Sequence, residues 1–449
     1  MIHRRLLSSC AVLASLAAFP ALVPGQDLLP KGAPQAAPVV LHNATIHTVS
    51  HGIVLGGTIW FDRGVIGGVL PAGESVKLPA DRPKPVHIDL AGKHVFPGMI
   101  SAHTSLGLIE IGAVPQTVDT DETGELTPEA LAVTAVNPDS AAIPVARQNG
   151  VLAALTFPTG GLMPGRASLI QLDGWTNRDM TVRADAGPVV AWPSTRAFGF
   201  RFRHRASASP ANDPSKRART NRQRIDEAFQ AAQRWFAART SDPTIALDVR
   251  HQALVPALRG EVPVFVLAND AEQIESAVLW GTERGLRVVI VGGREVRACT
   301  ELLRRHDVPV VLDGVHRLPR REDAAYDEAF TLPRDLAAAG VRFCIATGDE
   351  FSNDRNLPYH AATAAAYGLD PQRALAAITL HAAEILGVDD RLGSLAPGKD
   401  ATLFVSDGHP FELTSKIERA FVQGRAVDLR SKQTELANKY RTRYRQAGR

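Results

Sequence analysis

The pattern of hydrophobic and polar positions changes twice along this chain of 449 residues. Over residues 39–95, short runs alternate apolar and polar positions and are broken by Gly, Asn and Asp, which is typical of antiparallel strands. The same alternation returns near the end of the chain, where a Pro-Gly turn at 397–398 precedes the run "ATLFV". We therefore expect the flanks 38–97 and 391–430 to pair into one small composite β-sandwich domain.

The middle of the chain has a different period, in which apolar β-branched runs alternate with helical patterns. Strand-like runs occupy 262–270, 286–293 and 308–314, and the helical spacing of 271–285 lies between the first two. Such continuous apolar strands are buried on both faces, and their alternation with helices predicts a parallel sheet. Further runs that fit as strands read "VFPGMISAH", "GVLAALTFP", "GPVVAWP" and "VRFCIATGD". Their number predicts an α/β fold over 98–390, a (β/α)8 TIM-type barrel, with a doubly wound open sheet as the alternative.

Composition changes this picture little, but local charge adds two features. Hydrophobic residues make up 45% of the chain, enough for a large core, and the net charge of +3 indicates no particular partner. Residues 196–224 hold nine Lys and Arg and one acidic residue, Asp213. This basic insertion is either a contact surface for an anionic partner or a solvated loop that leads into a helix. Residues 431–449 predict a basic carboxyl-terminal helix. Since no nucleic-acid motif is present, we expect no nucleic-acid partner.

The first residues have the features of a secretion signal. "MIHRR" is basic, "LLSSCAVLASLAAFPALV" is apolar, and "PGQD" breaks the run beside the small residue Gly25. We expect residues 1–26 to be a signal peptide and the protein to be exported, to the periplasm or outside the cell. An uncleaved membrane anchor is the alternative.

Candidate chemistry lies where the predicted strands end. In parallel α/β folds, reactive groups gather at the carboxyl ends of the strands. The polar residues at these positions include His103, Asn269, Asp313, His316 and Asp349. We expect Asn269, Asp313 and His316 to bind a small-molecule substrate.

Three stretches carry a resemblance to a known family. They are "DLAGKHVFPGMISAHTSLG", "VPVFVLANDAEQIESAVLWGTERGLRVVIVGG", and "PQRALAAITLHAAEILGV" followed closely by "RLGSLAPGKDATLFV". Over roughly residues 38–428 the chain resembles the amidohydrolase superfamily, in particular its imidazolonepropionase-like branch. The resemblance implies a barrel with a composite β domain. It also implies metal-assisted hydrolysis, in which divalent ions activate a water molecule and an Asp on the eighth strand takes its proton.

The chain departs from that family at most of the metal-binding positions. His103 matches the first His of the usual His-x-His pair, but Ser105 replaces the second. Leu267 stands where the fifth strand usually carries a His, and Gly348 fills the usual Asp position, with Asp349 one residue further on. The resemblance thus leaves His103 and Asp349 as catalytic groups and metal ligands. A catalytic zinc needs about three protein ligands, so the replaced positions disfavour zinc.

Two functions from different classes follow. The first is a hydrolase of non-peptide, cyclic amide-like C–N bonds, with water activated by an Asp–His pair or by a weakly held metal. The second is a catalytically inactive barrel that serves as a binding or interaction protein. A resemblance in fold cannot choose between them.

Overall fold

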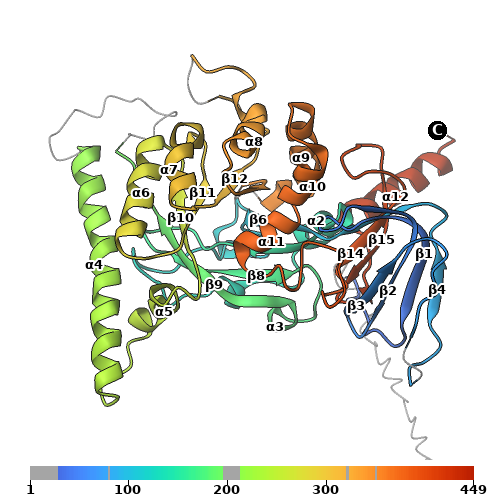
Figure 1. The fold of residues 1–449 in the computed structure, drawn as a ribbon, viewed down its shortest axis with the longest axis horizontal. Helices are drawn as coiled ribbons and strands as arrows, with labels where there is room; N and C mark the ends of the chain where they lie inside the picture. The colour runs from blue at the N-terminus through green and yellow to red at the C-terminus, as the bar shows by residue number, and fades with distance from the viewer. Residues whose placement is uncertain (1–28, 79–80, 196–212, 320–322, 349–350, 449) are drawn as a thin grey trace, which may run out of the picture.

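The computed structural model describes residues 29–78, 81–195, 213–319, 323–348 and 351–448 (Figure 1). The expected signal peptide, the first part of the basic insertion and Asp349 lie outside these ranges. Within them, no helix combines the length and the apolar character that crossing a membrane requires.

The two flanks of the chain form one β-rich domain. In Figure 1 the blue strands of the first flank lie beside the red strands of the second. The strands lie in the order β16-β15-β14-β5-β1-β2-β3, and β4 pairs with β1. The junction between the flanks is antiparallel, with Leu403 opposite Pro97 and Val405 opposite Val95. The strands are β1 (Val39–His47), β2 (Ile53–Asp62), β3 (Val65–Leu70), β4 (Val86–Asp89), β5 (His94–Pro97), β14 (Leu403–Ser406), β15 (Ile417–Val422) and β16 (Arg425–Ala426).

The central segment forms a second sheet of eight strands, in the order β13-β12-β11-β10-β9-β8-β7-β6. This sheet curves into a nearly closed barrel, so the expected TIM-type barrel with a β-rich domain is confirmed and the open doubly wound sheet is wrong. The strands are β6 (Met99–Thr104), β7 (Val151–Thr156), β8 (Gly165–Gln171), β9 (Thr181–Ala191), β10 (Val264–Ala268), β11 (Val288–Gly292), β12 (Val310–Asp313) and β13 (Phe343–Ala346).

One strand of the barrel runs against its neighbours. β8 is antiparallel to both β7 and β9, whereas the other neighbouring pairs are parallel. Residues 157–164 turn the chain back directly after β7, with Gly160 and Gly161 at positive φ. The sequence pattern predicted no strand here, because "TGGLMPGRA" has the composition of a loop.

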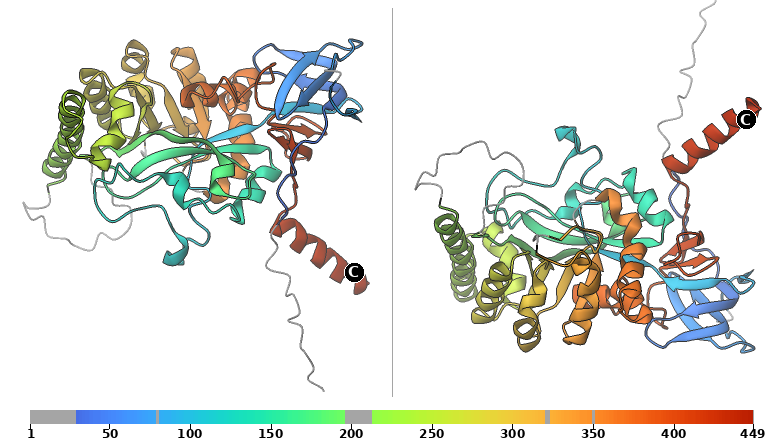
Figure 2. Two further views of the ribbon diagram at one scale, coloured as in Figure 1. Left: turned by 90° about the horizontal axis from the view of Figure 1, so that it is seen from below. Right: turned by 90° about the horizontal axis from the view of Figure 1, so that it is seen from above.

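Helices cover the outer face of the barrel (Figures 1 and 2). α6 shows how the sequence defines them, since a capping box of Asp270 and Gln273 begins it and Gly285, at a φ of 63°, follows its end. The helices are α1 (Ala132–Ala135), α2 (Ala142–Gln148), α3 (Asn177–Met180), α4 (Pro214–Ser241), α5 (Val249–Leu258), α6 (Ala271–Glu283), α7 (Thr300–Arg305), α8 (Glu328–Ala338), α9 (Leu357–Ala366), α10 (Pro371–Ala377), α11 (Leu380–Leu386) and α12 (Lys432–Gln446). α12 buries no residue and extends away from the body (Figure 2).

The barrel strands bury side chains on both faces. Phe265 and Val291 belong to the cluster inside the barrel, whereas Val266 and Ile290 belong to the cluster between strands and helices. Alternate residues of a strand thus fill two cores, which explains why these runs are continuously apolar. The packed interior leaves the strand ends as the place for chemistry.

Candidate functional site

A cavity of about 410 Å³ opens at the carboxyl ends of β11, β12 and β13. Every residue that lines it, apart from two glycines, carries a polar side chain. The charged and titratable members are Arg294, Asp313, His316, Arg317 and His360. A polar cavity at this end of a barrel is the expected location of a substrate site.

His103 and Asp313 form a buried pair beside this cavity. Nδ1 of His103, at the end of β6, lies 2.6 Å from Oδ1 of Asp313, at the end of β12. The edge of the imidazole also meets the ring of Phe157, at 4.7 Å between centroids. Burial opposes ionisation of Asp313, but the charge and hydrogen bond of His103, with Arg294 and Arg317 nearby, hold its pKa below the usual value. The pair is therefore an ionised carboxylate that orients an imidazole.

A second carboxylate lies deeper. Asp354, in the 3-10 turn Phe351–Asn356, is fully buried and accepts hydrogen bonds from the hydroxyls of Ser101, Thr104 and Thr347 at 2.6–2.8 Å. Burial raises the pKa of Asp354 to about 6, and these hydroxyls and the charge of His103 only partly offset it. Ser101 and Thr104 belong to β6 and Thr347 follows β13, so Asp354 joins the two strands at the ends of the barrel sheet.

Two histidines stack at the rim of the cavity. The rings of His316 and His360 lie 4.0 Å apart at an angle of 30°. His316 Nε2 lies 2.8 Å from Thr363 Oγ1, and His360 Nδ1 accepts the backbone N–H of Val315. Burial lowers the pKa of His316, and burial with the neighbouring His316 lowers that of His360 to about 3. Both rings are thus neutral at neutral pH.

Of the four expected site residues that the structure describes, three lie together and Asn269 does not line the cavity. His103, Asp313 and His316 gather around the cavity. Asn269 directly follows β10, where its side-chain oxygen is buried and has no hydrogen-bond partner within the described ranges. Asp349 lies outside the described residues, so its expected role stays a prediction. Sequence reasoning did not assign a role to Asp354, Arg294 or Arg317, which come from turns after strands and match no motif.

The residues that the structure describes do not supply the donor set of the divalent metal that the resemblance implies. Ser101, beside His103, donates to Asp354, and the half-buried Leu267 packs against the barrel interior. His103 Nδ1 lies 2.6 Å from the carboxylate of Asp313. Among the residues that the structure describes, no group of three or more His, Cys, Asp or Glu side chains could hold a metal ion. A catalytic zinc site takes about three protein ligands and keeps one position open.

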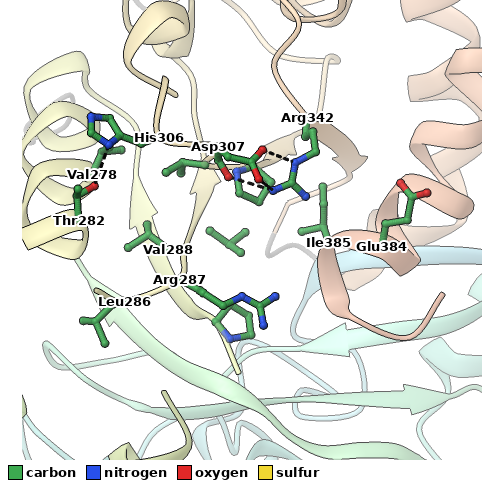
Figure 3. A pocket seen from close by; sticks show the side chains of 14 residues that line it. Val278, Thr282, Leu286, Arg287, Val288, His306, Asp307, Arg342, Glu384 and Ile385 are labelled. Atoms are coloured by element: carbon green, nitrogen blue, oxygen red, sulfur yellow. Dashed lines mark hydrogen bonds and ion pairs between the residues drawn. The ribbon is translucent and has the colours of Figure 1, made fainter. Parts of the chain in front are cut away.

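A second pocket, of about 230 Å³, lies at the opposite end of the barrel (Figure 3). Its lining residues precede β10, β11, β12 and β13, so it opens at the amino ends of these strands. Arg342 donates two hydrogen bonds to the carboxylate of Asp307 there, at 2.8 and 2.9 Å, while Arg287 donates to the backbone oxygen of Gly260. In barrels of this kind the amino ends serve stability and the carboxyl ends serve chemistry.

Comparisons with known proteins agree with this architecture. A model of the amidohydrolase family matches residues 284–428. The amidohydrolase tasK of Hapsidospora irregularis is 24% identical over 410 residues, which cover 82% of this chain and 40% of that protein. An imidazolonepropionase of Hahella chejuensis is 32% identical over 115 residues, or 25% of this chain and 21% of that protein. The chain thus spans about two fifths of the length of the first relative and about a fifth of the second.

The fold has a close counterpart among solved structures. The crystal structure of an amidohydrolase from Thermotoga maritima aligns with a TM-score of 0.74 and 24% identity, covering 87% of this chain and 100% of that one. The shared architecture is a TIM-type barrel with a β-rich domain. The chain is thus similar to amidohydrolases in sequence over residues 284–428 and in fold over most of its length.

Proposed function

We propose that this protein hydrolyses an amide-type C–N bond of a small molecule, with the His103–Asp313 pair as its base. The observation that supports this most directly is the partly buried hydrogen bond of 2.6 Å between the two side chains, beside a polar cavity at the carboxyl strand ends. The similarity of residues 284–428 to the amidohydrolase family supports the reaction class. The proposal includes a degenerate site that works without the family's metal ligands.

In the proposed reaction, Asp313 accepts the Nδ1 proton of His103 in a hydrogen bond and fixes the orientation of the ring. Nε2 then carries the lone pair in the neutral tautomer and takes a proton from the attacking water. The resulting imidazolium is stabilised by the ionised carboxylate of Asp313. The proton passes from His103 to the leaving nitrogen when the C–N bond breaks.

Kinetics of two variants test this proposal. His103→Ala and Asp313→Asn are each expected to lower kcat/KM about 10²- to 10⁴-fold, because both remove the oriented base. The assay measures release of the amine product from a panel of dihydropyrimidine, hydantoin and N-acyl amino acid substrates. Metal content is measured on the same preparations. His51→Ala, an exposed histidine of the β domain, is the control. The proposal fails if the purified protein holds near-stoichiometric metal that His103→Ala removes together with activity.

A catalytically inactive barrel remains the second candidate. It is favoured by Ser105 and Leu267, which stand where the resemblance expects metal-binding histidines. If no amide in the panel is cleaved, and ligands nevertheless bind in the cavity, this second function replaces the first.

Export is part of the proposal and rests on the sequence of residues 1–26 alone. Expression of the full chain in a Gram-negative host should place it in the periplasmic fraction with a new amino terminus near Gly25. A protein that stays in the cytoplasm with residue 1 in place would contradict export.

A further inference from the structure

We infer that α12 binds a membrane surface that carries anionic lipids, and that it lies in the interface with one face towards the acyl chains. The inference is independent of the proposed hydrolysis, because α12 takes no part in the candidate site. Helices with an apolar face and Lys or Arg beside it bind such surfaces through buried apolar area and electrostatic attraction.

An apolar stripe runs along α12. Leu436, Tyr440 and Tyr444 stand four residues apart, so their side chains lie on one face of the helix. They are 41%, 46% and 53% exposed, and no residue of α12 is buried. Tyrosine combines an apolar ring with a polar hydroxyl, and it is enriched where a membrane meets water. The stripe is therefore an uncovered face that suits a membrane interface.

Positive charges border this stripe on both sides. At about 3.6 residues per turn, Lys432, Lys439 and Arg443 fall on one side of it. Arg441 and Arg445 fall on the other side. The helix carries one acidic residue against these five cations, and none of the five forms an ion pair with a carboxylate in the described part of the chain. Their charge is thus available to lipid headgroups.

The first turn fixes α12 to the barrel. Ser431 is buried, accepts the backbone N–H of Thr434 as the helix cap, and lies 3.3 Å from Gln148 of α2 between side-chain oxygens. The following turns extend away from the body (Figure 2). The stripe is therefore presented at a distance from the barrel, where it can meet a flat surface.

Two observations favour a membrane over another protein. If the stripes of two copies of α12 packed together, the cations that border each stripe would repel one another. Leu29, with which the described chain begins, lines one pocket together with Lys432. The apolar stretch of the sequence at 6–23 ends only a few residues before Leu29. The segment that the sequence predicts to meet a membrane therefore enters the described structure beside the first turn of α12.

Co-sedimentation of the full chain with lipid vesicles tests the inference. Vesicles of equimolar phosphatidylglycerol and phosphatidylcholine should bind the protein about 10²-fold more tightly than vesicles of phosphatidylcholine alone. Tyr440→Ser combined with Tyr444→Ser should weaken binding to the mixed vesicles roughly tenfold, because apolar contact area is lost. Lys439→Gln, Arg441→Gln and Arg443→Gln combined should weaken it about 10²-fold, because each removes a charge beside the headgroups.

Lys216→Gln, Arg217→Gln and Arg219→Gln combined are the matched control. They remove three exposed charges of the basic insertion, at the start of α4. This variant should bind the mixed vesicles as the wild type does, and thermal melting should show that all variants fold. Equal binding to both kinds of vesicle, binding that survives both α12 variants, or an equal loss in the α4 variant would overturn the inference.

The same variants distinguish other partners of the stripe. A dimer that becomes a monomer when Tyr440 and Tyr444 are replaced, measured by sedimentation velocity, would overturn the inference in favour of contact between copies of this chain. Polyglutamate that binds the protein while the mixed vesicles do not would overturn it in favour of an acidic protein partner.

Discussion

At the scale of single residues, Asp354 is a carboxyl group whose environment differs strongly from solution. It is fully buried, its pKa is raised to about 6 by burial, and three hydroxyls donate to it. The folded state therefore holds a proton on Asp354 at pH values where the unfolded chain, with a pKa near 3.8, has lost it. The contribution of Asp354 to stability falls as pH rises from about 4 to about 6.

Asp354→Asn is expected to remove this pH dependence. Relative to the wild type, the variant should gain unfolding free energy between pH 4 and pH 7, by up to about 3 kcal/mol. Urea unfolding at a series of pH values, with Asp354→Asn compared at each pH, measures the difference. A difference that is constant over this range would show that Asp354 ionises in the folded protein as it does in water.

The sequence predicted part of the site at this scale. His103, Asp313 and His316 could be selected because polar residues at the ends of parallel strands share one edge of the sheet. Asp354 could not, because it lies in a 3-10 turn and its partners become neighbours only when the barrel curves around. Arg294 follows β11 in a run without a known spacing, so its place in the cavity depended on tertiary structure.

At the scale of secondary-structure elements, the β domain contains a histidine cluster at the junction of its two flanks. His47 of β1 is buried, lies 3.0 Å from His94 of β5 between ring nitrogens, and stacks on Phe96 at 4.1 Å. The ring of His409, after β14, meets His47 edge-on at 5.7 Å. Burial and these neighbouring histidines lower the pKa of His47 to about 4.

Acid is therefore expected to destabilise this junction. A histidine with a lowered pKa in the folded state contributes its stability above the unfolded value of 6.5 and loses it as pH falls towards 4. The loss should reach roughly 3 kcal/mol near pH 4. His47→Phe keeps the stacking on Phe96, and its melting temperature should fall less than that of the wild type as pH is lowered from 7 to 4. Thermal melting between pH 4 and pH 7 measures this pH dependence, with His51→Gln as the exposed control. The same pH dependence of the melting temperature in wild type and His47→Phe would contradict the expectation.

The elements themselves were largely readable from the sequence. The strand patterns at 262–270 and 308–314 became β10 and β12, and the helical spacing of 271–285 became α6. β8 was missed because its pairing with β7 and β9 depends on the turn at 157–164, which the pattern shows only as a loop. Continuous apolar runs indicate that a strand is buried, but they do not indicate the direction in which the strand runs.

At the scale of the whole molecule, Asp173 joins the barrel to the β domain. Its carboxylate accepts from Arg147 at 3.0 Å and from the backbone N–H of Gly32, and lies 3.7 Å from Arg425 of β16. The side chains of Asp173 and Arg147 are 0% and 2% exposed. Removing one partner of such a buried pair leaves an uncompensated charge.

Asp173→Ala is therefore expected to lower the free energy of unfolding by about 3–5 kcal/mol. Asp139→Ala breaks the ion pair with Lys31, in which the aspartate side chain is 48% exposed, and should cost less than about 1 kcal/mol. Urea unfolding of both variants measures the contrast. Similar losses for the two would mean that the buried contact does not hold the domains together.

The sequence could predict that two flanks and a barrel coexist, because the strand patterns and the family resemblance both pointed there. It could not predict which contacts connect the barrel to the β domain, since Arg147, Asp173 and Gly32 do not lie together along the chain and none belongs to a motif.

The reversed direction of β8 accounts for the position of the Asp173 contact between the barrel and the β domain. Had β8 run with its neighbours, Asp173, which follows it, would have emerged beside His103 and Asp313. Because β8 is antiparallel, Asp173 lies instead at the amino end of β7, close to Arg147 in the last turn of α2. The reversed strand thus places Asp173 away from the carboxyl strand ends, where the candidate site lies. At the other end of the barrel, Asp173 instead connects the barrel to the β domain.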